Sequence, residues 1–256
     1  MKKKDILLSV IIVTRNPGDD IYLTLSSLLP LNRKNIEIVL KDNSDVEDLS
    51  SINDTYQFEN FTFIHREDQG IYHAMNDAMN EASGKYFYFL NAGDQYYECD
   101  LDIFLAGAND KYAYFYGGFI NLYPFPRLVT YTRFMNKYSV YLKCINHQSV
   151  IFHRRVFEQL GGYNTFLKVE SDFLLITEMV CGFKGKKFHN YITIYKGGGF
   201  STTYTSSKEQ LDYYKKRKDS LYNFFELALL RAMVHVVKGF VLVKNYRKTR
   251  KVKRKS

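Results

Sequence analysis

The sequence predicts an α/β fold with a mostly parallel central sheet flanked by helices. Short apolar runs rich in β-branched and aromatic residues alternate with segments of helical periodicity. The connections between them are short, which is typical of βαβ units. Residues 86–90 (Tyr-Phe-Tyr-Phe-Leu) form an unbroken apolar run that is too short for a typical helix. Such a run indicates a strand that is buried on both faces, as in a parallel sheet.

The expected elements follow one another from the amino terminus. Residues 1–13 mimic the start of a signal peptide, but Asp5 interrupts the pattern and no cleavage site follows, so 9–13 are expected to be a buried first strand. A helix capped by Asp19 or Asp20 comes next, with Ile21 and Leu25 at helical spacing. The remaining elements are a strand at 36–40, a polar helix at 46–53, a strand at 61–64, a helix at 71–82 ended by Gly84, and the strand at 86–90.

Polar loops leave the carboxyl ends of these strands, and they should open on one edge of the sheet, where α/β proteins bind ligands. The loops carry residues 14–16, Asp42, Asp68 and Asp94. Gly93 frees the backbone before Asp94, and a carboxylate there can hold a divalent cation against phosphate oxygens. The alternative for Asp94 is an ordinary turn that it caps.

Composition limits the classes of function. The net charge is +9, but eight basic residues and no acid lie within 244–256, so 9 − 8 = +1 remains for the rest. A nearly neutral body without a recognition motif does not favour nucleic-acid binding. The three cysteines have no metal-ligand spacing and suit a reducing compartment. Neither GxGxxG after the first strand nor GxxxxGK[ST] is present, which disfavours dinucleotide oxidoreductases and P-loop enzymes.

Eight motifs resemble, in order, those of the family 2 glycosyltransferases, which have the GT-A fold. The subset most similar builds bacterial surface polysaccharides of the colanic-acid, capsule or O-antigen type. The matching segments are 9–16, 39–44, 67–76, 89–94, 146–152, 160–163, 170–172 and 197–201. The resemblance implies a GT-A domain at 1–205 and a helical extension with a basic tail at 206–256.

The resemblance also implies a role for each loop. Residues 14–16 and Asp42 would hold the nucleotide base and ribose, with Asp68 beside them, and Gly70 would let a helix amino terminus approach the diphosphate. Asp94 would bind the metal, Mg²⁺ or Mn²⁺. The full set of implied donor-binding residues is Thr14, Arg15, Asn16, Asp42, Asp68, Gly70, Asn76, Asn91, Ala92, Gly93, Asp94 and Ser201.

The sequence departs from the family pattern at two places. Residues 91–94 supply one carboxylate where many relatives supply two, so donor phosphates and waters would complete the metal shell. Gly118 stands where similar sequences often have an aspartate.

Transfer with inversion needs a base, and the resemblance implies Asp172, with Glu170 in reserve. Asp172 alternatively caps the helix that includes 173–179. His147 and Gln148 would contact the sugar, the acceptor or the metal, and a structural histidine is the alternative. Ser201 would belong to a lid over the donor phosphates or to a plain linker.

Residues 221–243 are mostly apolar, and their polar positions fall within about half of the helix circumference. Together with the basic tail, residues 221–256 predict an amphipathic helix on an anionic membrane surface, at the inner face of the cytoplasmic membrane. The alternative packs this helix on the body and leaves the tail solvated.

The resemblance therefore implies a metal-dependent, inverting glycosyltransferase. It would move a hexose-type sugar from a nucleotide-diphosphate donor, UDP-linked, to a hydroxyl of a glycan or lipid-carrier-linked acceptor in cell-surface polysaccharide synthesis. The alternatives are a catalytically silent nucleotide-sugar binding subunit and a nucleotidyltransferase.

Overall fold

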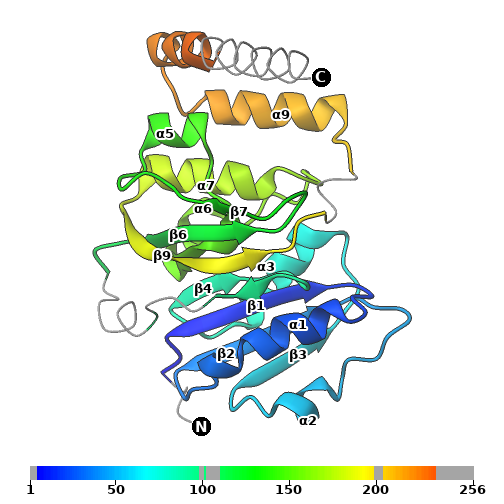
Figure 1. Ribbon diagram of the computed structural model, residues 1–256. Helices are drawn as coiled ribbons and strands as arrows, with labels where there is room; N and C mark the ends of the chain where they lie inside the picture. The colour runs from blue at the N-terminus through cyan, green and yellow to red at the C-terminus, as the bar shows by residue number, and fades with distance from the viewer. Residues whose placement is uncertain (1–4, 98–100, 102–109, 199–203, 235–256) are drawn as a thin grey trace, which may run out of the picture.

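The computed structural model describes residues 5–97, 101, 110–198 and 204–234. Their strands form one nine-stranded sheet in the order β3-β2-β1-β4-β8-β6-β9-β5, with β7 paired to β6 (Figure 1). The strands are β1 (Leu8–Thr14), β2 (Ile36–Asp42), β3 (Phe61–His65), β4 (Tyr86–Phe89), β5 (Gln95–Tyr96), β6 (Tyr114–Asn121), β7 (Arg127–Val129), β8 (Val150–His153) and β9 (Gly185–Tyr195).

The directions of the strands decide which loops meet. β1, β2, β3 and β4 are mutually parallel, and Thr14 lies opposite Asp42 in the register. β8 runs antiparallel to both β4 and β6, and β9 is parallel to β6. One edge of the sheet therefore receives the carboxyl ends of β1–β4, β6 and β9 together with the amino end of β8. The prediction of a shared edge is confirmed.

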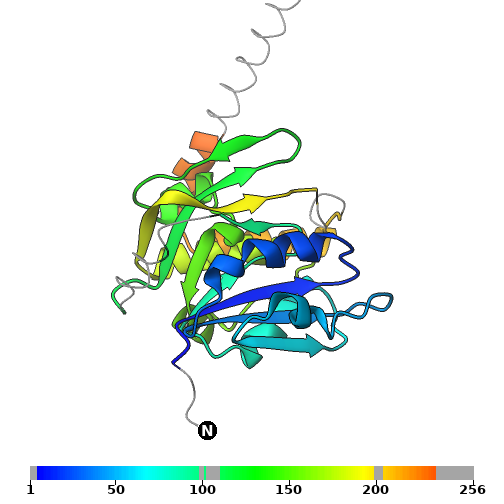
Figure 2. The ribbon, with the colours of Figure 1, turned by 60° about the horizontal axis from the view of Figure 1, so that its bottom comes forward.

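Helices cover both faces of this sheet (Figures 1 and 2). They are α1 (Asp20–Ser27), the 3₁₀ turn η1 (Leu29–Leu31), α2 (Ile52–Tyr56), α3 (Ile71–Glu81), α5 (Lys137–Leu142), the 3₁₀ turn η2 (His147–Ser149), α6 (Arg154–Leu160), α7 (Ser171–Gly182), α9 (Lys208–Asp219) and a helix at 224–234. In β4, Phe87 and Phe89 join the core beneath α3, α6 and α7, whereas Tyr86 and Tyr88 join the core beneath α1. The strand is thus buried on both faces, as its sequence predicts.

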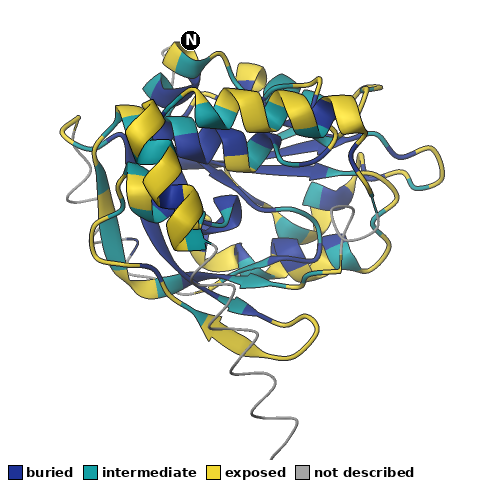
Figure 3. Cartoon of the chain, turned by 90° about the horizontal axis from the view of Figure 1, so that it is seen from above, coloured by how far each residue is buried: buried dark blue, intermediate teal, exposed yellow. Residues whose placement is uncertain are grey.

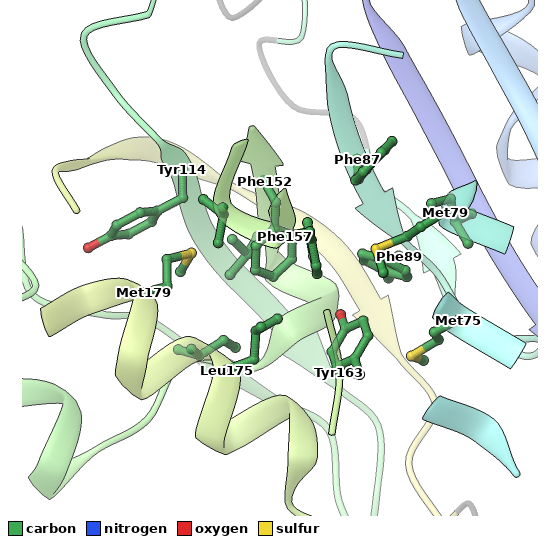
Figure 4. Close-up of a cluster of buried hydrophobic side chains, with 14 of the residues drawn as sticks. Met75, Met79, Phe87, Phe89, Tyr114, Phe152, Phe157, Tyr163, Leu175 and Met179 are labelled. Atoms are coloured by element: carbon green, nitrogen blue, oxygen red, sulfur yellow. The ribbon is translucent and has the colours of Figure 1, made fainter. Parts of the chain in front are cut away.

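An aromatic cluster fixes the helices that carry the site (Figure 4). Phe89 and Tyr163 meet edge to face with ring centroids 5.3 Å apart, and Phe152 and Phe157 lie 5.3 Å apart. Each such side chain contributes about 1.5–3 kcal/mol by burial, and favourable ring geometry adds to this. This packing holds α3, α6 and α7 against β4, β6 and β8, while the outer helix faces remain exposed (Figure 3).

The structure corrects the predicted start of one helix and the predicted end of another, and it gives Gly84 a different role. α2 begins at Ile52, so the polar residues from 46 onward form a loop instead of a helix. α3 ends at Glu81, three residues before Gly84. Gly84 is required for a different reason, because a Cβ there would lie 2.3 Å from the Ser9 hydroxyl oxygen.

The carboxyl-terminal part packs on the body. α9 lies against α7, where the Arg217 guanidinium is 2.7 Å from the Glu178 carboxylate. The helix at 224–234 buries Leu230 and leaves Phe224 and Phe225 exposed. Of the predicted amphipathic segment, 235–256 lie outside the described residues. Among the helices that are described, none has the length and apolar character needed to cross a membrane.

Candidate active site

A cavity of about 360 Å³ opens at the edge where the strand ends meet. It is lined by α3, by the loop after β4, by η2, by the start of α7 and by the segment after β9. Seven residues that the sequence singles out line it: Asn91, Ala92, Asp94, His147, Gln148, Glu170 and Asp172. The structure therefore brings the expected base and the expected metal ligand to one cavity.

Asp172 lies in the first turn of α7, and both of its carboxylate oxygens are hydrogen-bonded. The Tyr72 hydroxyl donates to Oδ1 at 2.7 Å, and His147 Nδ1 lies 3.0 Å from Oδ2. Burial raises the pKa of Asp172, but the hydrogen bonds from His147 and Tyr72 outweigh it and hold the pKa below its usual range. The N-cap of α7 is Glu170, so Asp172 is not the cap. An ionised carboxylate in the first turn is favoured by the helix dipole.

His147 links Asp172 to the cavity. Its residue surface is 7% exposed, and its Nε2 has no hydrogen-bond partner among the described residues. His147 lines the cavity, but this nitrogen is itself buried, so a bound ligand reaches it only if a neighbouring side chain moves.

Tyr72→Phe is expected to move the acid limb of kcat to higher pH when it is measured at saturating Mn²⁺ and donor, where the Asp94 carboxylate is held in its ionised form. The change removes one donor from the Asp172 carboxylate, which destabilises the ionised form and raises its pKa. Since a base must be ionised, the variant loses activity at a pH where the wild type is still active. A pH profile of turnover measures this shift.

Tyr114→Phe provides the matched control, because Tyr114 belongs to the same core but lies on β6 and does not line the cavity. An acid limb that stays in place for Tyr72→Phe would show that the Tyr72 hydroxyl does not tune Asp172.

Asp94 is 4% exposed and sits between two donors. Gln148 Nε2 donates to its Oδ2 at 2.5 Å, and the Lys196 backbone N–H donates to its Oδ1 at 2.8 Å. Burial raises the pKa of Asp94 to about 7, although these hydrogen bonds oppose the effect. Gly93 has φ +94°, which favours glycine, and a Cβ there would lie 3.0 Å from Lys196 Cδ. The predicted freedom of the backbone at Gly93 is confirmed.

The oxygens near Asp94 suit a hard divalent cation. Asn91 Oδ1 is buried without a hydrogen-bond partner among the described residues, and Asn91 lines the same cavity. Carboxylate and amide oxygens are ligands that Mg²⁺ and Mn²⁺ accept. No group of three or more His, Cys, Asp or Glu side chains within the described ranges could by itself hold a metal. The donor set fits a metal only if phosphate and water oxygens complete the shell.

The residues expected to hold the base and ribose gather at a second place on the same edge. The Asn16 backbone N–H donates to the Ser44 hydroxyl at 2.7 Å, and His65 Nδ1 lies 3.1 Å from Asp42 Oδ2. Beside them is a hollow of about 350 Å³ lined by residues 44–48, Ser50, Phe63 and His65. Thr14, Arg15, Asn16 and Asp42 line neither the main cavity nor this hollow, which corrects the expectation that they face the base and ribose directly.

Asp68 and Gly70 are hydrogen-bonded to each other at the start of α3. The fully buried Lys41 donates through Nζ to Asp68 Oδ2 at 3.0 Å, and Asp68 Oδ1 accepts the Gly70 backbone N–H at 3.0 Å. Gly70 is the N-cap of α3 with φ +131°. These hydrogen bonds fix the amino terminus of α3, which carries Tyr72.

Two further predicted residues stand apart from the cavity or cannot be placed. The Asn76 side chain bonds both backbone groups of Tyr163, at 2.8 and 2.9 Å, and does not line the cavity. Its amide therefore fastens the loop after α6, which corrects the expectation that it faces the donor. Ser201 lies outside the described residues.

The profile of the family described as Glycosyl transferase family 2 matches residues 9–164, more than half of the chain. The chain belongs to this family. Curated relatives include "PGL/p-HBAD biosynthesis glycosyltransferase" of Mycobacterium bovis and of Mycobacterium tuberculosis. Each is 27% identical over 177 residues, covering 65% of this chain and 67% of the relative.

Solved structures share the GT-A glycosyltransferase fold. S. aureus TarS 1-349 in complex with UDP-GlcNAc matches with a TM-score of 0.72 and 14% identity, covering 90% of this chain and 71% of that chain. A further TarS 1-349 structure has a TM-score of 0.63 and 16% identity over 75% of this chain, which spans only 60% of that one. Mannosyltransferase PcManGT from Pyrobaculum calidifontis in complex with GDP-Man and Mn²⁺ has a TM-score of 0.57 and 14% identity, covering 96% and 86%. At these identities the likeness establishes the fold alone.

The structure explains one departure of this glycosyl transferase from the family pattern. Gly118 lies in β6 where its register with β9 is irregular. A Cβ there would meet the Tyr191 ring and the Val129 carbonyl oxygen, both at 2.7 Å. No side chain fits at this position, so an aspartate is excluded by the packing of β7 and β9.

Sequence reasoning missed six charged or hydroxyl-bearing residues that line the cavity: Asp20, Tyr72, Lys168, Tyr195, Lys196 and Tyr204. Lys196 Nζ lies 2.7 Å from both carboxylate oxygens of Asp20, and its backbone N–H holds Asp94. Lys196 directly precedes the glycines of the 197–201 motif. A cation next to a glycine run in a protein expected to bind a diphosphate was the signal that could have identified it.

Proposed function

We propose that this family member is an inverting glycosyltransferase that moves a hexose-type sugar from a UDP-linked donor to an acceptor hydroxyl. The observation that supports this most is that Asp94 and Asp172, the expected metal ligand and the expected base, line one cavity. Hydrogen bonds from Tyr72 and His147 hold the pKa of Asp172 below its usual range, as a base that is ionised before the reaction requires.

In this proposal Asp172 is the base. The acceptor oxygen attacks the anomeric carbon, the bond from that carbon to the diphosphate oxygen breaks, and the hydroxyl proton moves to a carboxylate oxygen of Asp172. Tyr72 and His147 keep Asp172 ionised before the reaction, as their hydrogen bonds of 2.7 and 3.0 Å favour the charged form. Glu170, whose Oε2 accepts from the Ser206 hydroxyl at 2.7 Å, lines the same cavity as the reserve candidate.

Asp94 and Asn91 would hold a Mg²⁺ or Mn²⁺ ion, which when bound offsets charge on the leaving diphosphate. Lys168 and Lys196 line the cavity and add positive charge from the protein itself. Gln148 orients Asp94 through the hydrogen bond between its Nε2 and Oδ2. The name of PcManGT in complex with GDP-Man and Mn²⁺ is consistent with a divalent metal in this fold.

We assign the second hollow, beside Asp42, to the nucleoside of the donor. Its lining includes the Phe63 and His65 rings, which stack with centroids 6.4 Å apart, and the polar groups of residues 44–48. An aromatic wall with nearby backbone and carboxylate acceptors can take a base and a ribose.

The acceptor in this proposal is a glycan or a lipid-carrier-linked sugar used in cell-surface polysaccharide synthesis. The enzyme would then work in the cytoplasm, peripheral to the inner face of the membrane. Residues 221–256 would supply the attachment, since each Lys or Arg near anionic lipid contributes about 1 kcal/mol and eight lie within 244–256.

A nucleotide-sugar panel tests the proposal directly. We expect one UDP-sugar to raise the melting temperature more with Mn²⁺ or Mg²⁺ present than without, and to be slowly hydrolysed when no acceptor is added. Binding without any hydrolysis or transfer would instead favour the catalytically silent subunit. A panel in which no nucleotide sugar binds contradicts the proposed function.

A further inference from the structure

The hairpin that joins β6 to β7 has an exposed apolar end. Leu122, Tyr123, Phe125 and Leu128 are 40%, 53%, 78% and 64% exposed. Arg127 and the two prolines between them are exposed as well. In Figure 2 this hairpin, coloured green, projects from the body of the molecule. Single exposed apolar residues are ordinary, but four within seven consecutive positions form a patch that suggests an interaction surface. We call residues 122–128 the hairpin tip.

The charged residues of the segment that carries the hairpin tip all have one sign. Residues 111–157 contain no Asp or Glu. Arg127 and Arg133 are exposed, and neither forms an ion pair with a carboxylate in the part of the chain that the structure describes. Lys143 lies at the base of the hairpin, where its Nζ donates to the Thr130 carbonyl at 2.9 Å. Aromatic and aliphatic side chains beside unpaired cations suit an anionic lipid surface, where rings enter the interface and cations meet headgroups.

The hairpin tip also adjoins the cavity. The Leu122 backbone N–H donates to the Tyr195 carbonyl at 2.9 Å, and Asn121 pairs with Tyr195 across the strands. A Cβ on Gly197 would lie 2.5 Å from Tyr123 Cβ, so the Tyr123 side chain packs directly against that glycine. Tyr195, Gly197 and Gly198 all line the 360 Å³ cavity. A surface that holds the hairpin tip therefore also holds one wall of the cavity.

We infer that the hairpin tip docks on an anionic lipid surface and inserts Phe125 and Leu128 into its interface, which sets the cavity beside the membrane. This inference rests on the proposed use of a membrane-linked acceptor, and it assigns the contact to the folded body as well as to the basic tail. A second copy of the chain is a poorer occupant, because the same tip would bring Arg127 and Arg133 against their own symmetry mates.

The absence of tryptophan from the chain provides a direct test. Phe125→Trp places a single tryptophan at the hairpin tip, and Tyr22→Trp places one on α1, where Tyr22 is 47% exposed. Both full-length proteins are mixed with phosphatidylcholine vesicles, with and without phosphatidylglycerol, and with bromine-labelled lipid chains as quenchers. We expect a blue shift and quenching for Phe125→Trp with anionic vesicles, and neither for Tyr22→Trp.

Loss of the apolar side chains gives a second readout. The double variant Phe125→Ser, Leu128→Ser is expected to partition into anionic vesicles roughly tenfold more weakly, since two apolar side chains leave the interface. The measurement is made at raised salt, which screens the contribution of the basic tail. Deleting residues 244–256 should weaken partitioning while the Phe125→Trp blue shift of the bound protein persists.

Two results would overturn the inference. One is vesicle-bound Phe125→Trp protein whose tryptophan emission and quenching match those in water. The other is a blue shift that appears without vesicles and depends on protein concentration, which would identify a second copy as the occupant. UDP-sugar hydrolysis in vesicle-free solution is measured in parallel. The rate of hydrolysis should be the same in the hairpin variants as in the wild type. If the wild-type protein does not hydrolyse any UDP-sugar, that result counts against the proposed function and not against membrane docking.

Discussion

Asp172→Asn is expected to lower kcat by about a hundredfold or more, the range that a positioned base contributes, while donor binding stays close to that of the wild type. Asparagine keeps the shape of the side chain but cannot accept the acceptor proton. Asp172 lines the cavity without contacting Asp94 in the structure, so the donor site should persist. Single-turnover kinetics and donor titration separate the two effects.

Glu170→Gln is the matched control for this prediction. Glu170 lies two residues away, lines the same cavity, and accepts a hydrogen bond from the Ser206 hydroxyl that glutamine can also accept. We expect a much smaller loss of turnover than for Asp172→Asn. If the two variants exchanged these effects, Glu170 would be the base, and near-normal turnover of Asp172→Asn would remove Asp172 from that role.

The sheet and the edge where its loops meet could be predicted, because both follow from patterns that are visible in the sequence. Burial of β4 on both faces follows from an unbroken aromatic run, and parallel strands bring Thr14, Asp42 and the 91–94 loop to one edge. Asp94 and Asp172 do line one cavity, as the motifs imply. The roles assigned to these residues stay predictions.

The sequence could not show how far apart the loops lie along that edge of the sheet. Asp42 ends β2 and the 91–94 loop follows β4, with β1 between them. Because neighbouring strands lie about 4.8 Å apart, two steps separate these groups by about 10 Å. The order of the motifs along the sequence therefore does not decide whether Asp42 and the 91–94 loop line one pocket or two. The structure shows a cavity and a separate hollow.

Long-range partners are also invisible in the sequence. Tyr72 and Asp172 are 100 positions apart, and Lys196 and Asp20 are 176 apart. Their meeting depends on how α3 and α7 pack on the aromatic cluster and on β9 returning parallel to β6. No local sequence pattern predicts the packing of these helices or the direction of β9.

Asp94→Ala is expected to abolish the part of donor affinity that depends on Mg²⁺ or Mn²⁺. It removes the one carboxylate of the 91–94 loop and leaves Asn91 Oδ1 as the remaining hard oxygen there, which is too sparse a set to hold the ion. It also leaves the Gln148 amide and the Lys196 N–H without their acceptor, at a cost in folding stability of about 1–3 kcal/mol for each buried group. Asp94→Asn retains the shape and one acceptor oxygen, so it separates loss of the charge from loss of the fold.

Donor titration with and without Mn²⁺ measures this effect, and Asp20→Asn is the control, since Asp20 lines the cavity but is paired with Lys196. Asn91→Asp makes the opposite change and restores a second carboxylate to the loop. We expect it to tighten Mn²⁺-dependent donor binding, because added ligand charge raises affinity for a hard cation. If Mn²⁺ strengthens donor binding equally in the wild type, Asp94→Asn and Asn91→Asp, the ion is not held by this loop. The positive charge that offsets the leaving diphosphate must then come from Lys168 and Lys196.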